Sequence, residues 1–359
     1  MEFKDRLRIA RTRAGFSMAD LGSKLRTPVS AQSINKYEKG GMMPSSGTLH
    51  DLSIALNVSL DVLMKGQVVE LEDVEFRKRA SISEQDRAII RHDVLEFLER
   101  CLAVEDMLGE NEAVTGFDTV VAEEIDDIEG AEDVASKIRA EWSLGIEPIP
   151  SLTNLLEERH IRVQEIGGAE GFFGMTCRIK RAGNKPPIPV IVRRHVNVER
   201  DRFTTAHEIA HAFIRGCRNG KLEKAIDRCA GALLMPADSL KREVGSHRGM
   251  IAYGEVVRLK HLYGVSAVAL LYRLRDLGIV SEQTHKGMFR NPRTRVWLKT
   301  EPEPLDDAGD VAKNERPRRF ESMVLRAASE GIIRTIRAAE LLGWQVAKVE
   351  ECIWGPQAA

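Results

Sequence analysis

The spacing of apolar residues divides the chain into short N-terminal helices, one long helix and a mixed region. Over residues 1–66, apolar positions at helical spacing are interrupted by Gly, Pro and Ser, which predicts about five short helices. From 83 to 109, apolar residues step alternately by four and three, at Ile90, Val94, Phe97, Cys101, Val104 and Leu108. This heptad seam is typical either of packing within the chain or of a dimer coil, and extra apolar neighbours favour packing within the chain.

The middle of the chain carries strand patterns. Residues 161–166 alternate between apolar and polar, residues 172–179 are strand-like, and a Gly/Pro-rich turn precedes the apolar run 188–192. These patterns predict a short sheet. Helical spacing returns at 255–280, and a charged, Pro-containing linker at 300–317 leads to two expected helices within 316–354. The expected fold class is therefore α+β, mostly α.

Composition adds little, whereas the distribution of charge is informative. The apolar fraction of 43% and the charged fraction of 30% are ordinary for a globular protein, so they indicate no function. The net charge is only -1, but residues 1–66 hold ten Lys and Arg against six Asp and Glu. A basic N-terminal region suits a polyanionic partner.

The cysteines and the N-terminus indicate a compartment. Five widely spaced cysteines form no CxxC pair, which argues against a disulfide framework and against a cysteine-based zinc site. The first residues are charged, and no apolar run approaches about 18 residues, the length that spans a membrane. We expect a cytoplasmic protein without membrane segments.

The strongest chemical signal is an HExxH motif at residues 207–211. Positions i and i+4 of a helix lie on one face, so His207 and His211 can both direct a ring nitrogen at one metal ion. Glu208 would lie beside the metal, where it can take a proton from a metal-bound water. Hydrolytic zinc sites usually hold three protein ligands and one open position, which predicts a third ligand downstream and one Zn²⁺ per chain.

Glu223 is the expected third ligand. It begins a helix-like run in which Asp227 follows at i+4, and Asp227 could accept a hydrogen bond from the free ring nitrogen of a ligand histidine. A bare HExxH also arises by chance, as a surface charge pair with two ordinary histidines. The apolar flanks of the motif, the downstream carboxylate and the preceding sheet favour the metal site. A Cys229 thiolate ligand is the minor alternative. His247, Tyr253 and Tyr272 are candidate oxyanion donors by chemistry alone, and a structural role is the better expectation for each.

The pattern of apolar and polar residues at the N-terminus predicts the order helix, helix, turn, helix. The segments Leu7–Arg11, Ser17–Leu25 and Ser30–Gly40 resemble the XRE class of helix-turn-helix domains, related to phage repressors and Cro, and the resemblance covers about residues 3–66. In such a domain the second motif helix enters the major groove of double-stranded DNA. The expected contacts are Gln32, Ser33, Asn35 and Lys36. Met18 stands where Gln is common, and a helical module used only for protein contact is the alternative.

The run RFTTAHEIAHAFI, followed by ExxxDRxAGALLMP, resembles the ImmA/IrrE family of metallo-endopeptidases over roughly residues 130–280. The resemblance implies that His207, His211 and Glu223 bind zinc and that Glu208 is the general base. Ile226 and Cys229 stand where the family usually has Ala and Phe, and neither change removes a catalytic group.

The two resemblances together predict a DNA-binding regulator fused to a zinc-dependent endopeptidase. The implied substrate is a protein partner, often a helix-turn-helix repressor, cleaved in a stress, phage or mobile-element response. The alternative is a regulator or antitoxin-like protein whose peptidase fold serves only for binding, and a homodimer stays open. The expected units are a five-helix DNA-binding domain at 1–66, a helical connector at 67–130, a zincin-like peptidase domain at 131–281, and a linker with helices of unknown role at 282–359.

Overall fold

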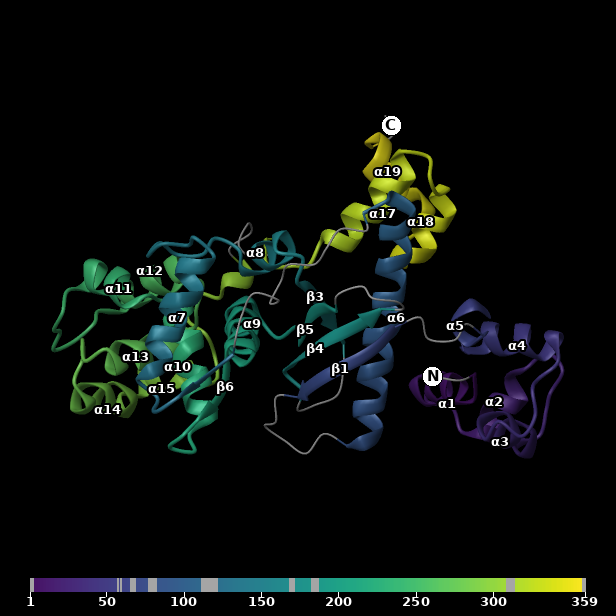
Figure 1. Ribbon diagram of the computed structural model, residues 1–359, viewed down its shortest axis with the longest axis horizontal. Helices are drawn as coiled ribbons and strands as arrows, with labels where there is room; N and C mark the ends of the chain where they lie inside the picture. Colours follow the sequence, from purple (N-terminus) through teal and green to yellow (C-terminus); the bar gives the residue numbers. More distant parts are fainter. Residues whose placement is uncertain are drawn as a thin grey trace.

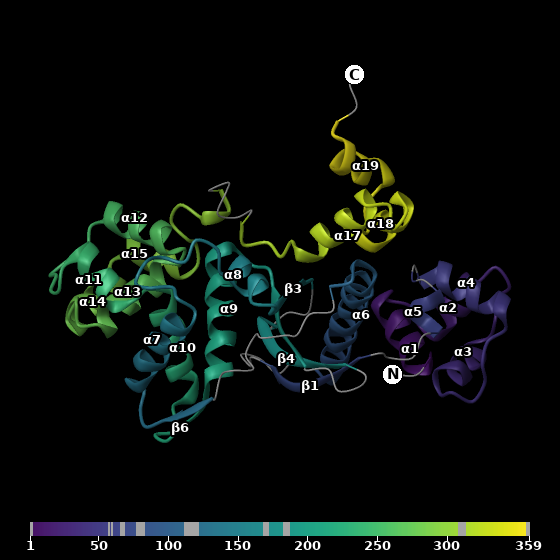
Figure 2. The same cartoon turned by 45° about the horizontal axis from the view of Figure 1, so that its top comes forward.

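The computed structural model describes residues 3–56, 58, 60–64, 69–76, 83–110, 122–167, 172–181, 187–307 and 314–356. These residues are mainly helical, with a four-stranded sheet near the centre (Figure 1). The long helix α6 (Glu84–Leu108) stands between the N-terminal helices and this sheet, and the C-terminal helices cover one of its ends (Figures 1 and 2). The expected α+β, mostly α class is confirmed.

The N-terminal unit contains the five predicted helices, α1 (Phe3–Arg13), α2 (Met18–Lys24), α3 (Ala31–Glu38), α4 (Ser46–Leu56) and α5 (Leu60–Met64). Ser17 caps α2 in a capping box with Asp20, and Ser30 caps α3 by accepting a hydrogen bond from the Ser33 amide. Apolar side chains from all five helices form a separate small core, so this unit has the bundle that its sequence pattern predicts.

The central sheet has the strand order β1-β4-β5-β3. Its strands are β1 (Val69–Phe76), β4 (Gly174–Arg181), β5 (Ile188–Arg194) and β3 (Arg162–Ile166). Strand β4 is antiparallel to both of its neighbours, and β3 runs parallel to β5. Met175, Cys177 and Ile179 of β4 pack with residues of α6 in one core. Helix α9 (Val198–Phe213) contacts β4 and β5, so the sheet lies between α6 and α9.

The heptad seam of α6 packs within the chain, as expected. Ile90 and Val94, in the first half of the helix, join the core beneath the sheet. Val104, in the second half, joins a core with the C-terminal helices. Between them, Phe97 meets Phe320 edge-on with ring centroids 5.2 Å apart. One helix thus supports two separate parts of the molecule.

Two expectations were wrong. Residues 69–76 fall in the region expected to be a helical connector, but they form the edge strand β1, because pairing with β4 satisfies their backbone groups. Residues 316–354 contain three helices instead of two: α17 (Arg319–Ser329), α18 (Thr335–Leu342) and α19 (Val346–Trp354). Gly331 and Gly343 adopt positive φ angles of 72° and 67°, and these turns separate the three helices.

The helices around α9 form the largest apolar core. They are α7 (Gly130–Glu141), α8 (Leu152–Glu158), α10 (Leu222–Leu234), α11 (Ala237–Val244), α12 (Tyr253–Tyr263) and α13 (Ala267–Asp276). The chain continues through α14 (Glu282–Arg290), α15 (Pro292–Arg295), η1 (Val296–Leu298) and η2 (Leu305–Asp307). A small parallel pair, β2 (Glu123–Ile125) with β6 (Ile214–Cys217), extends from the end of α9.

The segment after η1 is bound into this core. Leu305 is fully buried, and its amide donates to the buried carboxylate of Glu199 at the start of α9. Glu315 accepts hydrogen bonds from the amides of Leu152 and Thr153, at the start of α8. The same carboxylate pairs with Arg202 of α9, and both side chains are almost completely buried. The region expected to be a linker at 300–317 therefore supplies polar partners to buried groups in the core around α9.

Within the described residues, we find no helix that combines the length and the apolar composition needed to cross a membrane.

Candidate metal centre

Helix α9 brings the HExxH residues together. Asn197 caps the helix by accepting a hydrogen bond from the Arg200 amide. His207 and His211 are one turn apart on this helix, and the His207 side chain is only 1% exposed. Apolar neighbours such as Ile209 and Ala210 are fully buried, so the helix is fixed in the core. The histidines therefore have a rigid support.

Three potential ligands meet at one point. The Nε2 atoms of His207 and His211 are 3.1 Å apart. The Glu223 carboxylate, on the first turn of α10, lies 3.6 Å from His207 Nε2 and 3.9 Å from His211 Nε2. In a tetrahedral zinc site with Zn–N bonds of about 2.0–2.1 Å, two nitrogens are roughly 3.3 Å apart. The donor atoms and their spacing thus fit a zinc ion, and the side of Glu223 that faces solvent leaves room for water.

Asp227 lies behind the first histidine. Its Oδ1 atom is 2.8 Å from His207 Nδ1, one helical turn after Glu223. A carboxylate in this position holds the proton on Nδ1, which leaves Nε2 with its lone pair facing Glu223 and His211. The geometry is the one expected for Asp227 as a support to a ligand histidine.

Glu208 is buried and is held by the sheet. The Thr176 hydroxyl of β4 donates to Glu208 Oε2 at 2.8 Å. Gly174, two residues earlier, leaves space for the same carboxylate, because a Cβ atom there would lie 3.0 Å from Glu208 Oε1 and 2.7 Å from Thr204 Cγ2. Neither residue is among those predicted from the sequence. Their only signal is a small residue and a hydroxyl on one face of a predicted strand.

The alternative residues have other surroundings. Cys229 is fully buried, and burial raises the pKa of its thiol to about 12, so the thiol is protonated and poorly suited to bind a metal. The Tyr253 hydroxyl donates to Glu303, and Tyr272 packs against the rings of His285 and Phe289. His247 is exposed. Among the contacts of the described residues, Tyr253, Tyr272 and His247 have none with His207 or His211.

A second group of potential ligands lies near the start of α9. Donor atoms of Glu165, His195 and Asp201 are within 4.8 Å of one another. His195 Nδ1 is 2.6 Å from Asp201 Oδ2, and the Val196 amide donates to Asp201 Oδ1 at 3.1 Å. The Arg193 guanidinium lies 3.5 Å from Glu165. Because Arg193 pairs with Glu165 while His195 and the Val196 amide bind Asp201, both carboxylates have partners within the chain, and we interpret the group as a support for the start of α9.

The candidate DNA-contacting residues lie on α3. Gln32 and Lys36 are exposed, whereas Ser33 and Asn35 are half-buried. Behind them, Glu38 is buried and forms a two-fold ion pair with Arg11 of α1, at 2.6 Å and 2.9 Å. This pair raises the pKa of Arg11, mainly through the hydrogen bond from Arg11 to Glu38. This link between α3 and α1 was not predicted from the sequence.

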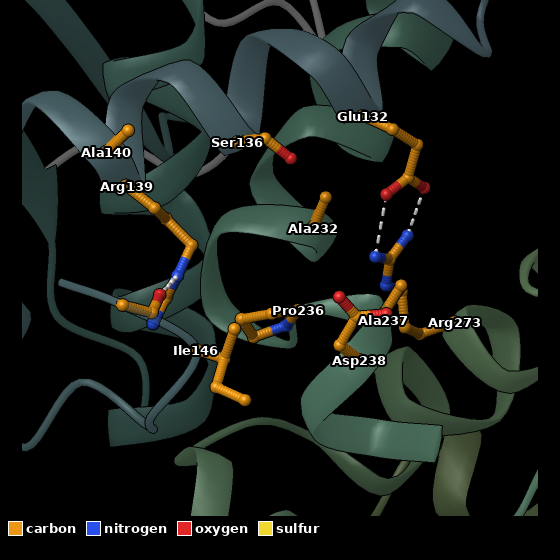
Figure 3. A pocket seen from close by; sticks show the side chains of 11 residues that line it. Glu132, Ser136, Arg139, Ala140, Ile146, Ala232, Pro236, Ala237, Asp238 and Arg273 are labelled. Atoms are coloured by element: carbon orange, nitrogen blue, oxygen red, sulfur yellow. Dashed lines mark hydrogen bonds and ion pairs between the residues drawn. The ribbon is translucent and has the colours of Figure 1, made fainter. Parts of the chain in front are cut away.

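A separate pocket of about 310 Å³ lies among α7, α10, α11 and α13 (Figure 3). Figure 3 shows the Glu132 carboxylate joined to the Arg273 guanidinium at its rim. Arg139, on the opposite side, donates to the backbone carbonyls of Gly145, Leu233 and Glu147. These charged groups hold the surrounding helices together. The pocket contains none of the HExxH residues, and we assign it no role.

Comparison with known families supports the division of the chain into a DNA-binding part and a peptidase-like part. The family model described as the IrrE N-terminal-like domain matches residues 179–275, a range that contains the histidine pair, Glu208, Glu223 and Asp227. The model described as helix-turn-helix matches residues 7–63. The search of curated proteins gave no match. The chain therefore joins an XRE-type helix-turn-helix domain, as in DNA-binding regulators, to a peptidase-like domain of the ImmA/IrrE family.

Proposed function

We propose that the chain is a DNA-bound or DNA-directed regulator whose second domain is a zinc-dependent endopeptidase. The observation that carries this proposal is the convergence of three donor atoms, from His207, His211 and Glu223, within 4.8 Å of one another. Two histidine nitrogens and one carboxylate are a ligand set found in zinc peptidases, whereas structural zinc is usually enclosed by four ligands rich in cysteine.

In this proposal each side chain has a separate task. The bound metal would lower the pKa of a bound water molecule to about 7 and polarise the peptide carbonyl. Glu208 takes the proton of that water and passes it to the leaving amine. Thr176 holds the Glu208 carboxylate by a hydrogen bond of 2.8 Å. Asp227 fixes the ring of His207 through Nδ1.

The N-terminal domain would bring this activity to DNA. Gln32 and Lys36 stand exposed on α3, where a base contact and a phosphate contact are the expected roles. The capped start of α3 and the Arg11–Glu38 ion pair fix this helix on its bundle. Following the family resemblance, the proposed substrate is a protein partner, a repressor of the helix-turn-helix kind.

The second candidate function is regulation without catalysis, with the peptidase fold used for binding. The buried and hydrogen-bonded Glu208 favours hydrolysis over this alternative, because a binding surface has no need for an acidic side chain in that position.

The deciding experiment combines metal analysis with cleavage of a peptide library. The purified chain and its Glu208→Gln variant are loaded with zinc, and the products from a proteome-derived peptide library are identified by mass spectrometry. We expect about one zinc per chain in both proteins, and cleavage that falls by about 10²–10⁴ in the variant. Replacement of the exposed Glu158 by Gln is the matched control. Equal product profiles for the chain and the Glu208 variant would exclude the proposed mechanism.

A further inference from the structure

Strand β4 is the strand whose residues contact Glu208. Thr176 donates to the Glu208 carboxylate, and Gly174 lies against it. Because side chains alternate along a strand, Arg178 and Lys180 share the face of Thr176, whereas Met175, Cys177 and Ile179 face the core with α6. The active-site face of β4 is therefore basic beyond Thr176.

The outer edge of β4 is filled by β1. The two strands are antiparallel, with Glu70 opposite Lys180, Glu72 opposite Arg178 and, after an irregularity, Glu75 opposite Thr176. A strand edge is a ready site for an extended peptide, which binds it through main-chain hydrogen bonds. Here a segment of the chain itself takes that place, and it reaches the residue that holds Glu208.

The sequence of β1 matches the charge of β4. Of its eight residues, Val-Glu-Leu-Glu-Asp-Val-Glu-Phe, four are acidic. Residues directly opposite in an antiparallel pair share a face, and opposite charges there stabilise the pairing. In the backbone register, Glu70 is paired with Lys180 and Glu72 with Arg178. The apolar Leu71 packs against the core under the sheet.

Strand β1 lies outside the matched peptidase region. The IrrE N-terminal-like match begins at residue 179 and the helix-turn-helix match ends at residue 63. β1 lies between them along the chain, after α5 and before α6. Along the chain, β1 thus links the DNA-binding unit to the edge of the candidate active site.

We propose that the outer edge of β4 is a docking strand for an extended acidic peptide and that β1 is its internal occupant. A substrate segment of the same character must displace β1 before it reaches Glu208, so the chain is latent while β1 is paired. Latency rests on the proposed endopeptidase function, whereas peptide docking can be tested without catalysis.

The test uses the full chain and a fluorescein-labelled synthetic peptide of residues 69–76. The double variant Glu70→Lys/Glu72→Lys places like charges opposite Lys180 and Arg178, which weakens the pairing of β1. We expect this variant to bind the peptide at least about tenfold more tightly than the unmodified chain, as measured by fluorescence anisotropy. If the double variant folds poorly, the single Glu72→Lys variant can replace it, and we expect the same change in affinity to a smaller extent.

Two controls make the result specific. Glu340→Lys/Glu351→Lys changes the net charge equally at exposed positions on α18 and α19, and should bind the peptide as the unmodified chain does. Adding Arg178→Glu/Lys180→Glu to the double variant restores opposite charges in the strand pair and should abolish the gain. Equal peptide binding by the unmodified chain and both β1 variants would overturn the docking proposal.

The cleavage assay then separates the two proposals. If the chain is a peptidase, the β1 double variant should cleave faster than the unmodified chain. Tight peptide binding without cleavage in any variant would retain the docking strand and exclude the endopeptidase. Cleavage that is unaffected by release of β1 would retain the endopeptidase and exclude latency.

Discussion

The hydroxyl of Thr176 donates to Oε2 of Glu208 across 2.8 Å, which joins the central sheet to the helix of the HExxH motif. The position of the carboxylate thus depends on β4 as much as on α9. Two residues earlier on β4, Gly174 completes the same contact surface. The proposed active site is therefore expected to respond to changes in the sheet that leave all proposed metal ligands in place.

A methyl group at Gly174 should impair catalysis and spare metal binding. In Gly174→Ala the added Cβ would lie 2.7 Å from Thr204 Cγ2 and 3.3 Å from the Val192 carbonyl, so Glu208 and its helix must shift. We expect zinc content to stay near one per chain and the cleavage rate to fall by about 10-fold or more. Gly167→Ala is the control, because its Cβ would meet no atom within 4 Å. Equal rates for both variants would show that Gly174 does not position Glu208.

Removal of the charge on Asp227 should weaken zinc binding. The carboxylate supports His207 at 2.8 Å, and residues that hold ligand histidines typically contribute about 10–100-fold to metal affinity. We expect Asp227→Asn to raise the zinc dissociation constant by such a factor in competition with a fluorescent chelator. Asp238→Asn, an exposed change on α11, should leave the constant unchanged. An unaltered affinity in Asp227→Asn would count against the proposed role.

The Glu132 ion pairs predict an acid-sensitive fold. Burial alone would raise the pKa of Glu132, but hydrogen bonds and charge from Arg273 and Arg228 lower it below its ordinary value of 4.5. The folded state therefore holds fewer protons than the unfolded state, and the stabilisation is present above pH 4.5 and lost as the pH falls through the folded pKa.

Urea unfolding measures this effect. The free energy of unfolding should be lower for Glu132→Gln than for the unmodified chain at about pH 7, and the difference should shrink at about pH 3.5. A difference that is the same at both pH values would show that the ionised carboxylate is not the source of the stability.

Replacement of the exposed polar residues of α3 should weaken DNA binding. We expect Gln32→Ala/Lys36→Ala to lower the affinity for an operator duplex, selected from random sequences, by about 10-fold or more. Loss of one phosphate contact should also reduce the slope of log affinity against log salt by about one. Lys221→Ala, just before α10, is the control. Unchanged binding by the α3 variant would exclude α3 as the recognition helix.

The sequence was most informative where its signals were local. The i and i+4 spacing of His207 with His211, and of Glu223 with Asp227, follows from helix geometry alone, so the candidate ligands could be named before the fold was known. The heptad seam similarly predicted the packing of α6 within the chain.

Contacts between segments far apart in the chain could not be predicted from such local patterns. Half of the residues of β1 are acidic, and its partner β4 lies about 100 residues later in the chain, so the pairing that completes this strand is not a local signal. Thr176 and Gly174 gain their importance from a helix that crosses their strand. The division of the C-terminal region into three helices depended on two glycines whose left-handed conformation the apolar spacing does not show.

The buried Glu315 bears on how the protein is made. Its carboxylate meets the amide of Leu152, 163 positions earlier in the chain, and pairs with Arg202, which precedes it by 113 positions. Arg193 of β5 also donates to the Glu315 main-chain carbonyl. During synthesis the sheet and α9 leave the ribosome well before residue 315, so the guanidinium groups of Arg193 and Arg202 lack this acceptor until roughly the last eighth of the chain emerges. Completion of the candidate peptidase core is thus a late event in translation, and a message truncated before that point would yield a protein unable to finish folding.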